Sequence, residues 1–174
     1  MPPVLPRSTP TLDRVERALD RLAGVCTLVA GVQIVVLIAI FGWLVFGRYV
    51  LDDTPTWVEA LALVLVVWIT FLGAAVGVWR RSHLSIDFVR EAMPPVLRTP
   101  LRWLAALGMV VFGGFLAWQG WSLTMLTWGR TVPMLGVSEG WRALPMALSG
   151  ALTVVFSLFH LAALAREGRD PTEP

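Results

Sequence analysis

The stretch ALALVLVVWITFLGAAVGVW, residues 60–79, decides the fold. It runs for 20 residues without Asp, Glu, Lys or Arg, and a helix needs roughly 20 apolar residues to cross the hydrocarbon core of a bilayer. Residues 22–47, 103–129 and 143–165 are equally free of these charged residues. The runs are too long and too uniform for the alternating strands, about 10 residues each, of a membrane barrel. The sequence therefore predicts an all-α integral membrane protein with four transmembrane helices.

The composition agrees with a membrane location and narrows the function. Of 174 residues, 56% are hydrophobic and 15% charged, and the mean hydropathy is +0.71. These values lie outside the range of soluble domains. The net charge is only +2, which does not indicate nucleic-acid binding. Cys26 is the single cysteine, so an internal disulfide and a cysteine-cluster metal site are excluded.

The expected segments form one membrane domain. Residues 1–10 contain four prolines and are predicted to be disordered. Apolar residues recur at helical spacing in residues 11–21, which predicts an amphipathic helix at the membrane interface. Ser85 can cap a short surface helix that two prolines end. The predicted segments, in chain order, are an interfacial helix 11–21, spans 22–47 and 57–79, a surface helix 85–93, spans 103–129 and 142–165, and a tail 166–174.

The arginines and tryptophans predict how these spans lie in the membrane. Eleven of the 14 arginines lie before the first span, between the second and third, or after the fourth. The positive-inside rule therefore places both termini and the central loop in the cytoplasm. Most of the nine tryptophans fall near span ends, as expected for an interfacial aromatic belt. Trp68, Trp118 and Trp121 lie deeper, and we expect them to pack against other helices.

Small residues predict where helices approach each other closely. Gly73 and Gly77 form a GxxxG pair in the second span, and such faces let helix backbones come together. The fourth span repeats the spacing at Ala143, Ala147 and Ala151. At the start of the second span, Thr56 and Glu59 have the spacing of a capping box, which predicts that this helix begins near Trp57.

No feature of the spans indicates catalysis. None of their cores contains an acid, lysine or arginine, whereas a transporter that binds a charged solute by itself usually keeps a buried charge. Glu59 lies close to the interface expected at Trp57, where capping and snorkelling explain it better than proton transfer. Arg48 can pair with an acid of the outer turn or with lipid phosphate. We therefore predict a protein that is not an enzyme and has no cofactor or metal.

Two histidines leave an alternative open. His83 and His160 both fall toward the predicted cytoplasmic side, so a haem or quinone site has to be considered. Their expected depths differ, because His83 lies in the loop while His160 lies inside the fourth span. The alternative function is a membrane-anchor subunit of a redox complex that binds haem b or quinone.

Residues 46–87 resemble the small membrane subunit of tripartite ATP-independent periplasmic (TRAP) transporters, the DctQ family. The order and spacing of the matching residues are more specific than any single residue. Similar positions follow in the second outer loop and the fourth span. The residues that carry the resemblance are Arg48, Tyr49, Trp57, Glu59, Trp68, Phe71, Leu72, Gly73, Ala74, Ala75, the basic pair Arg80 and Arg81, His83, Asp87, then Val132, Pro133, Met134, Leu135, Gly136, Val137 and Pro145.

The resemblance implies a role in a bacterial inner membrane. In such a system a soluble periplasmic substrate-binding protein captures an organic acid or related solute. A large multi-span permease subunit then carries the solute across by a sodium-driven, elevator-like movement. The small subunit, embedded in membrane lipid, braces the large one and offers outer surface to the binding protein. This implies contacts with the large subunit, or between helices, at Trp68, Gly73, Ala74 and Gly77.

The resemblance also implies partner-binding or packing roles for residues outside this small-residue face. Arg48, Glu59 and the outer loops are candidates for docking of the binding protein. The remaining candidates are Trp57, Arg81, His83, Asp87, Pro133, Met134 and Gly136.

Overall fold

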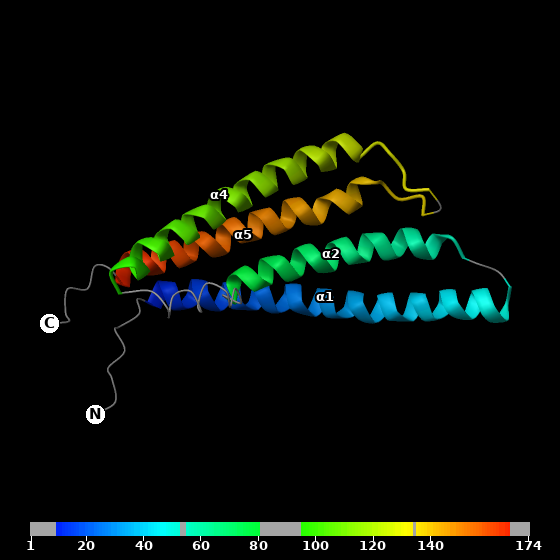
Figure 1. Ribbon diagram of the computed structural model, residues 1–174, viewed down its shortest axis with the longest axis horizontal. Helices are drawn as coiled ribbons and strands as arrows, with labels where there is room; N and C mark the ends of the chain where they lie inside the picture. The colour runs from blue at the N-terminus through cyan, green and yellow to red at the C-terminus, as the bar shows by residue number, and fades with distance from the viewer. Residues whose placement is uncertain (1–9, 53–54, 81–94, 134, 168–174) are drawn as a thin grey trace, which may run out of the picture.

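The computed structural model describes residues 10–52, 55–80, 95–133 and 135–167 (Figure 1). These residues form the helices α1 (Pro10–Val50), α2 (Trp57–Trp79), α4 (Pro95–Thr127) and α5 (Gly140–Glu167). Each contains a segment long and apolar enough to cross a membrane. The prediction of an all-α membrane protein with four spans is therefore confirmed.

The helix bounds differ from the expected segments mainly at the first and third spans. The expected interfacial helix 11–21 and first span are one continuous helix, α1, whose 41 residues extend about 60 Å. Helix α4 begins at Pro95, eight residues before the expected third span, because proline fits the first turn of a helix, where its missing N–H is not needed. Of the predicted segments 1–10, 85–93 and 166–174, Pro10 belongs to α1 and residues 166–167 belong to α5, and all other residues lie outside the described part of the chain.

The helices form two antiparallel hairpins that meet through α2 and α5. Helix α1 pairs with α2 and α4 with α5, and α2 packs against α5. Helix α1 begins, and α5 ends, at one end of the bundle (Figure 1), which we call the base. Helices α1 and α4 end, and α2 and α5 begin, at the other end, the turn end, and the two hairpins separate toward it.

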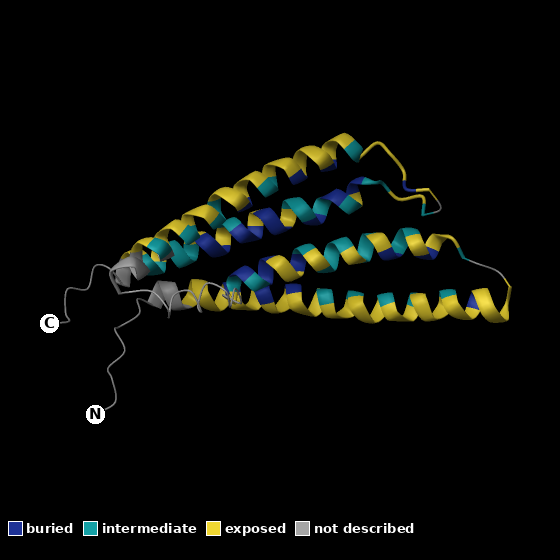
Figure 2. Cartoon of the chain, viewed as in Figure 1, coloured by how far each residue is buried: buried dark blue, intermediate teal, exposed yellow. Residues whose placement is uncertain are grey.

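A narrow seam joins α1 to α2. The residues of α1 that are shielded between Leu19 and Gly47 recur at alternating intervals of four and three, the spacing of a left-handed coiled coil. All other α1 residues in this stretch are exposed, as the yellow surface in Figure 2 shows. The seam consists of Leu19, Ala23, Cys26, Ala30, Gln33, Leu37, Ile40, Leu44 and Gly47.

The α4–α5 hairpin is held by close contact between glycines and backbone. A Cβ on Gly120 would lie 2.8 Å from the Cα of Ala147, and a Cβ on Gly150 would lie 2.8 Å from the Cα of Ala117. Only glycine fits at these two crossings. The small-residue prediction is confirmed for Ala147.

The other predicted small residues behave differently. Ala143 is buried, but Ala151 is exposed. Trp118 and Trp121 were expected to pack against other helices, and within the described chain that prediction is wrong. They are exposed, Trp118 by 76%, because α4 turns its glycine face toward α5 and these two rings lie on the opposite side.

The core lies toward the base, where α1, α2 and α5 meet. Phe156 of α5 is fully buried there, beside Leu72 and Ala75 of α2 and Ala23 of α1. Trp68, Trp79, Met109 and Phe159 pack around this cluster. The junction fixes the two hairpins relative to each other and sets which faces of α2 remain open.

Candidate functional site

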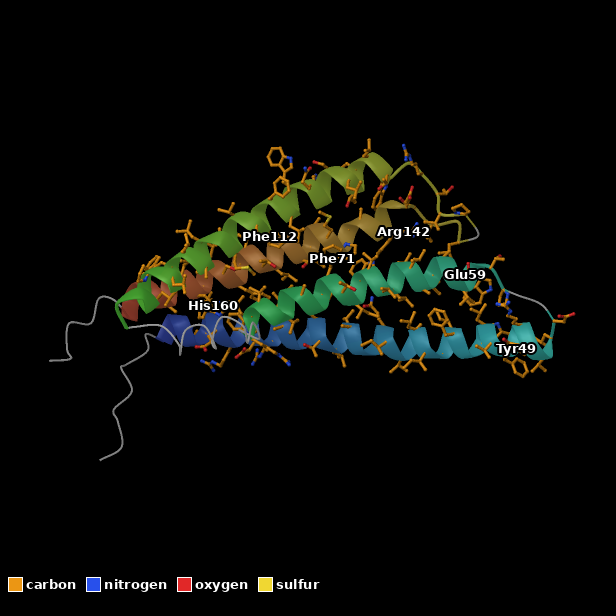
Figure 3. All side chains as sticks on the ribbon, in the orientation of Figure 1. Tyr49, Glu59, Phe71, Phe112, Arg142 and His160 are labelled. Carbon is orange, nitrogen blue, oxygen red and sulfur yellow. The ribbon has the colours of Figure 1, made fainter. Side chains whose placement is uncertain are left out.

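At the turn end, α1 stops in a geometry that exposes Arg48 and Tyr49. The N–H of Leu51 donates to the carbonyl of Gly47 at 3.2 Å, and Asp52 adopts a positive φ of 53°, which ends the helix. Tyr49 is 80% exposed. Figure 3 shows Tyr49 and Glu59 at this end of the molecule. Among the described residues, no ion pair joins Arg48 to Asp52 or Glu59.

Helix α2 begins at Trp57 as expected, but the predicted capping box is absent. Thr56 has helical backbone angles, φ −65° and ψ −21°, and its side chain makes no capping hydrogen bond. A side-chain cap normally requires an extended backbone at that position. Instead, the N–H of Val58 donates to the carbonyl of Pro55 at 3.2 Å. Glu59 therefore takes no part in a helix cap, and its side chain is exposed.

The second connection at the turn end is a compact hydrogen-bonded loop. The N–H of Val132 donates to the carbonyl of Val137 at 2.8 Å, and the N–H of Glu139 donates to that of Arg130 at 2.7 Å. Gly136 has a positive φ of 65°, a conformation that glycine adopts without strain. Pro133 is exposed on this loop, and the neighbouring Met134 lies outside the described residues.

Trp68 ties α2 to the first turn of α5. Its indole N–H donates to the backbone carbonyl of Trp141 at 2.9 Å, and the two ring centroids are 6.2 Å apart. The prediction that Trp68 packs against another helix is confirmed. The Trp68 side chain is therefore engaged in a contact within this chain.

Gly73, Ala74 and Gly77 do not form a close helix contact in the described part of the chain. A Cβ on Gly73 or Gly77 would meet nothing within 4 Å, and Gly73 and Ala74 are exposed. Helix α2 instead buries Leu72, Ala75 and other residues on its opposite side. The predicted small-residue face is thus an open surface of the chain.

At the base, Trp79 joins three helices. Its indole N–H donates to a carboxylate oxygen of Asp20 at 2.6 Å. The Trp79 ring lies 5.1 Å from that of Phe156 and stacks on the imidazole of His160 at 5.5 Å. His160, labelled in Figure 3, is therefore accounted for by packing.

Several predicted candidates lie outside the described residues. Arg81, His83 and Asp87 belong to this group together with Met134. Sequence reasoning in turn missed Asp20, whose partner is 59 residues away. It also missed the residues through which α4 contacts α5 closely. Gly113, Ala117 and Gly120 are small residues at helical spacing, which could have indicated this contact.

Residues 37–167 match the family described as "Tripartite ATP-independent periplasmic transporters, DctQ component". The chain belongs to the DctQ family. This match covers the turn end, the open face of α2 and the whole α4–α5 hairpin, so the family assignment rests on most of the described structure. The predicted resemblance is confirmed.

Named relatives of this DctQ-family chain are TRAP transporter proteins. The sialic acid TRAP transporter small permease protein SiaQ of Vibrio cholerae is 25% identical over 131 residues, 72% of this chain and 76% of the relative. The C4-dicarboxylate TRAP transporter small permease protein DctQ of Pseudomonas aeruginosa is 33% identical over 92 residues, 52% of this chain and 41% of the relative. The chain is thus the small subunit of a TRAP transporter, a multi-pass protein of the inner membrane.

A third relative is much longer. The sialic acid TRAP transporter permease protein SiaT of Haemophilus influenzae is 39% identical over 64 residues, which are 35% of this chain but 10% of the relative. A segment like part of this DctQ-family chain therefore occurs within a far larger permease polypeptide. The comparisons favour a transporter subunit over a redox-complex anchor.

Proposed function

We propose that this subunit braces the large permease subunit and helps to dock a periplasmic substrate-binding protein during sodium-coupled uptake of an organic acid or related solute. The observation that carries the proposal is that the cores of the four spans contain no Asp, Glu, Lys or Arg. A charged solute bound within the membrane is usually matched by a buried charged residue. This chain supplies helix contacts instead of such residues, and the large subunit carries the solute across the membrane.

The bracing role fits the way the two hairpins are joined. The glycine contacts of α4 with α5 and the Trp68 and Trp79 contacts of α2 hold the helices together. Helix α1 and the open small-residue face of α2 keep much of their apolar surface exposed. We infer that Gly73, Ala74 and Gly77 offer part of this surface to the large subunit.

The docking role belongs to the turn end. Arg48, Tyr49 and Glu59 are exposed there, and the loop that contains Pro133 and Gly136 is held in one shape by backbone hydrogen bonds. The arginine distribution supports a periplasmic location for this end and a cytoplasmic location for both termini. Arg81, His83 and Asp87 then belong to the cytoplasmic loop, where we propose contacts with the large subunit.

The experiment is affinity purification of the tagged chain in mild detergent, from cells that also express the large permease subunit and the binding protein of the same transporter. The proposal expects the large subunit in a fixed ratio to the chain. Recovery of the chain without the large subunit, or with a flavin or iron–sulfur subunit, contradicts it.

The docking role is tested in the same preparation with Arg48→Glu. Charge reversal at the turn end is expected to lower recovery of the binding protein severalfold and to leave recovery of the large subunit unchanged. Arg14→Glu is the matched control, because Arg14 is an exposed arginine at the opposite end of α1. Equal losses from both variants would remove the assignment of docking to the turn end.

A further inference from the structure

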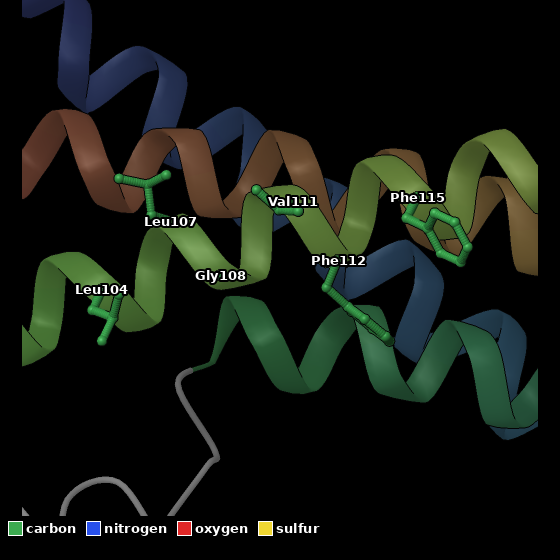
Figure 4. Close-up of a pocket in the computed structure, with 6 residues that line it drawn as sticks. All are labelled: Leu104, Leu107, Gly108, Val111, Phe112 and Phe115. Atoms are coloured by element: carbon green, nitrogen blue, oxygen red, sulfur yellow. The ribbon is translucent and has the colours of Figure 1, made fainter.

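Helices α2, α4 and α5 enclose an indentation of about 260 Å³, here called the α2–α4–α5 groove. Phe71, Ala74 and Gly77 of α2 form one wall, Phe112 of α4 the other, and Ser149 of α5 lies at the floor. Figure 4 is a close-up of a second pocket, lined by α4 residues alone, and it shows the Phe112 side chain extending from α4 toward α2, in contrast to Leu107 on the same helix. The groove therefore opens beside the small residues of α2 that make no close contact within the described chain.

The floor of the groove contains a buried hydroxyl without a partner. Ser149 is 1% exposed, and its Oγ has no hydrogen bond within the described part of the chain. The hydroxyl of Thr124, which is also buried, differs because it donates to the carbonyl of Gly120 at 2.7 Å. An unpaired buried hydroxyl is costly, and lipid offers it no partner. A hydrogen-bonding group that reaches Ser149 from the groove would pair this hydroxyl.

Size and depth determine what kind of occupant fits. The volume of about 260 Å³ is below the range of roughly 300–1,000 Å³ for small-molecule sites. Ser149 lies about 14 Å along α5 from Gly140, far from either end of the span Gly140–Ala165. Lipid headgroups do not reach this depth, and an acyl chain cannot bond a hydroxyl. A protein side chain or backbone carbonyl can.

We propose that the α2–α4–α5 groove receives a transmembrane helix of the large permease subunit and that this helix hydrogen-bonds to Ser149. The inference rests on the proposed function and identifies the main contact between this chain and the large subunit. Ala74 and Gly77 allow a second helix backbone to approach closely, and a Cβ at Gly77 would have open space. The SiaT relative, in which a segment like part of this chain makes up 10% of a single permease polypeptide, supports a permease helix as the occupant.

Photo-crosslinking locates the occupant. The photoreactive amino acid p-benzoylphenylalanine replaces Phe112 in one variant and Phe115 in another, with the large subunit and binding protein of the same transporter co-expressed. Both phenylalanines are exposed residues of α4, but only Phe112 lines the groove. We expect an adduct with one helix of the large subunit from position 112, at least fivefold above position 115. Equal yields, or an adduct at position 112 with lipid or with a second copy of this chain, overturn the proposal.

The hydroxyl is tested by comparing Ser149→Ala with Ser157→Ala. Both serines are buried and unpartnered among the described residues, but only Ser149 lines the groove. Ser149→Ala is expected to weaken association with the large subunit about threefold to tenfold, and Ser157→Ala to leave it unchanged. Equal effects of the two variants, or no effect of Ser149→Ala, overturn the hydrogen bond.

A variant that fills the groove with a larger side chain is a second test. The open space at Gly77 accommodates this side chain within the fold. Gly77→Leu is expected to abolish recovery of the large subunit, and Gly114→Leu, at an exposed α4 position with equally open space, to preserve it. If the unmodified chain fails to recover the large subunit, the proposed function itself fails. If the unmodified chain and Gly77→Leu both recover it fully, only the groove assignment fails.

Discussion

The indole N–H of Trp79 donates a 2.6 Å hydrogen bond to the carboxylate of Asp20 and thereby joins the end of α2 to the first part of α1. The same ring stacks on His160 of α5. Three helices therefore converge on one side chain at the base, while the hairpins separate toward the turn end. We regard this junction as the point that holds the two hairpins at a fixed angle.

Trp79→Phe tests the hydrogen bond while it keeps an aromatic ring. A hydrogen bond to a charged group contributes about 1.5–3 kcal/mol, and the exposed setting of this one reduces the expected loss to about 1 kcal/mol. Unfolding of the purified protein in mild detergent measures the effect. A double-mutant cycle with Asp20→Ala should give a coupling free energy of about 1 kcal/mol. A coupling near zero would show that the bond does not stabilise the junction.

Gly120→Ala tests the close contact between α4 and α5. The added Cβ would lie 2.8 Å from the Cα of Ala147, so the helices must separate, at a cost of about 1–3 kcal/mol. Gly114→Ala is the control, because a Cβ there meets nothing within 4 Å and alanine favours helix over glycine by up to about 1 kcal/mol. Thermal unfolding in detergent should place the two variants on opposite sides of the unmodified protein. Equal stabilities would contradict the glycine contact.

Phe156→Ala tests the core at the base. Phe156 is fully buried where α1, α2 and α5 meet, and removal of a buried phenylalanine costs about 3–5 kcal/mol in water-soluble proteins. We expect about half of that here, because lipid is as apolar as the core and only the packing contribution is lost. Phe115→Ala, on the exposed face of α4, should change the free energy of unfolding by less than about 0.5 kcal/mol. Similar losses for both would contradict a core at the base.

The number and type of the membrane-spanning helices could be read from the sequence, whereas the faces that they present to each other could not. A run such as residues 60–79 is long enough to require a spanning helix, so the span count follows from length and composition. In a membrane, however, the lipid-facing and helix-facing sides are both apolar. Periodicity therefore does not separate Gly73, which faces outward, from Gly120, which contacts the backbone of α5.

The candidate site was predictable only in part, for the same reason. The position of Trp68 deep in a span correctly indicated packing, but the same argument failed for Trp118. The Asp20 bond to Trp79 joins residues 59 positions apart, and no local pattern contains that information. No sequence pattern distinguishes Ser149 from Ser157, and only the arrangement of α2, α4 and α5 makes Ser149 line the groove.

The direction of insertion is tested with single cysteines in a Cys26→Ser background. Leu51→Cys lies at the turn end and Glu16→Cys at the base, both at exposed positions near opposite ends of α1. The positive-inside rule predicts that a membrane-impermeant maleimide labels the cysteine at position 51 in spheroplasts. The cysteine at position 16 should react only after the membrane is opened. The reverse pattern would place the termini in the periplasm.

Uptake into proteoliposomes tests the central claim, that this subunit braces a transporter and does not itself carry the solute. Vesicles containing this chain alone, the large subunit alone or both are given the binding protein, labelled solute and an inward sodium gradient. The account predicts sodium-dependent uptake only when both subunits are present. Uptake by this chain alone, or full uptake by the large subunit without it, would contradict the account.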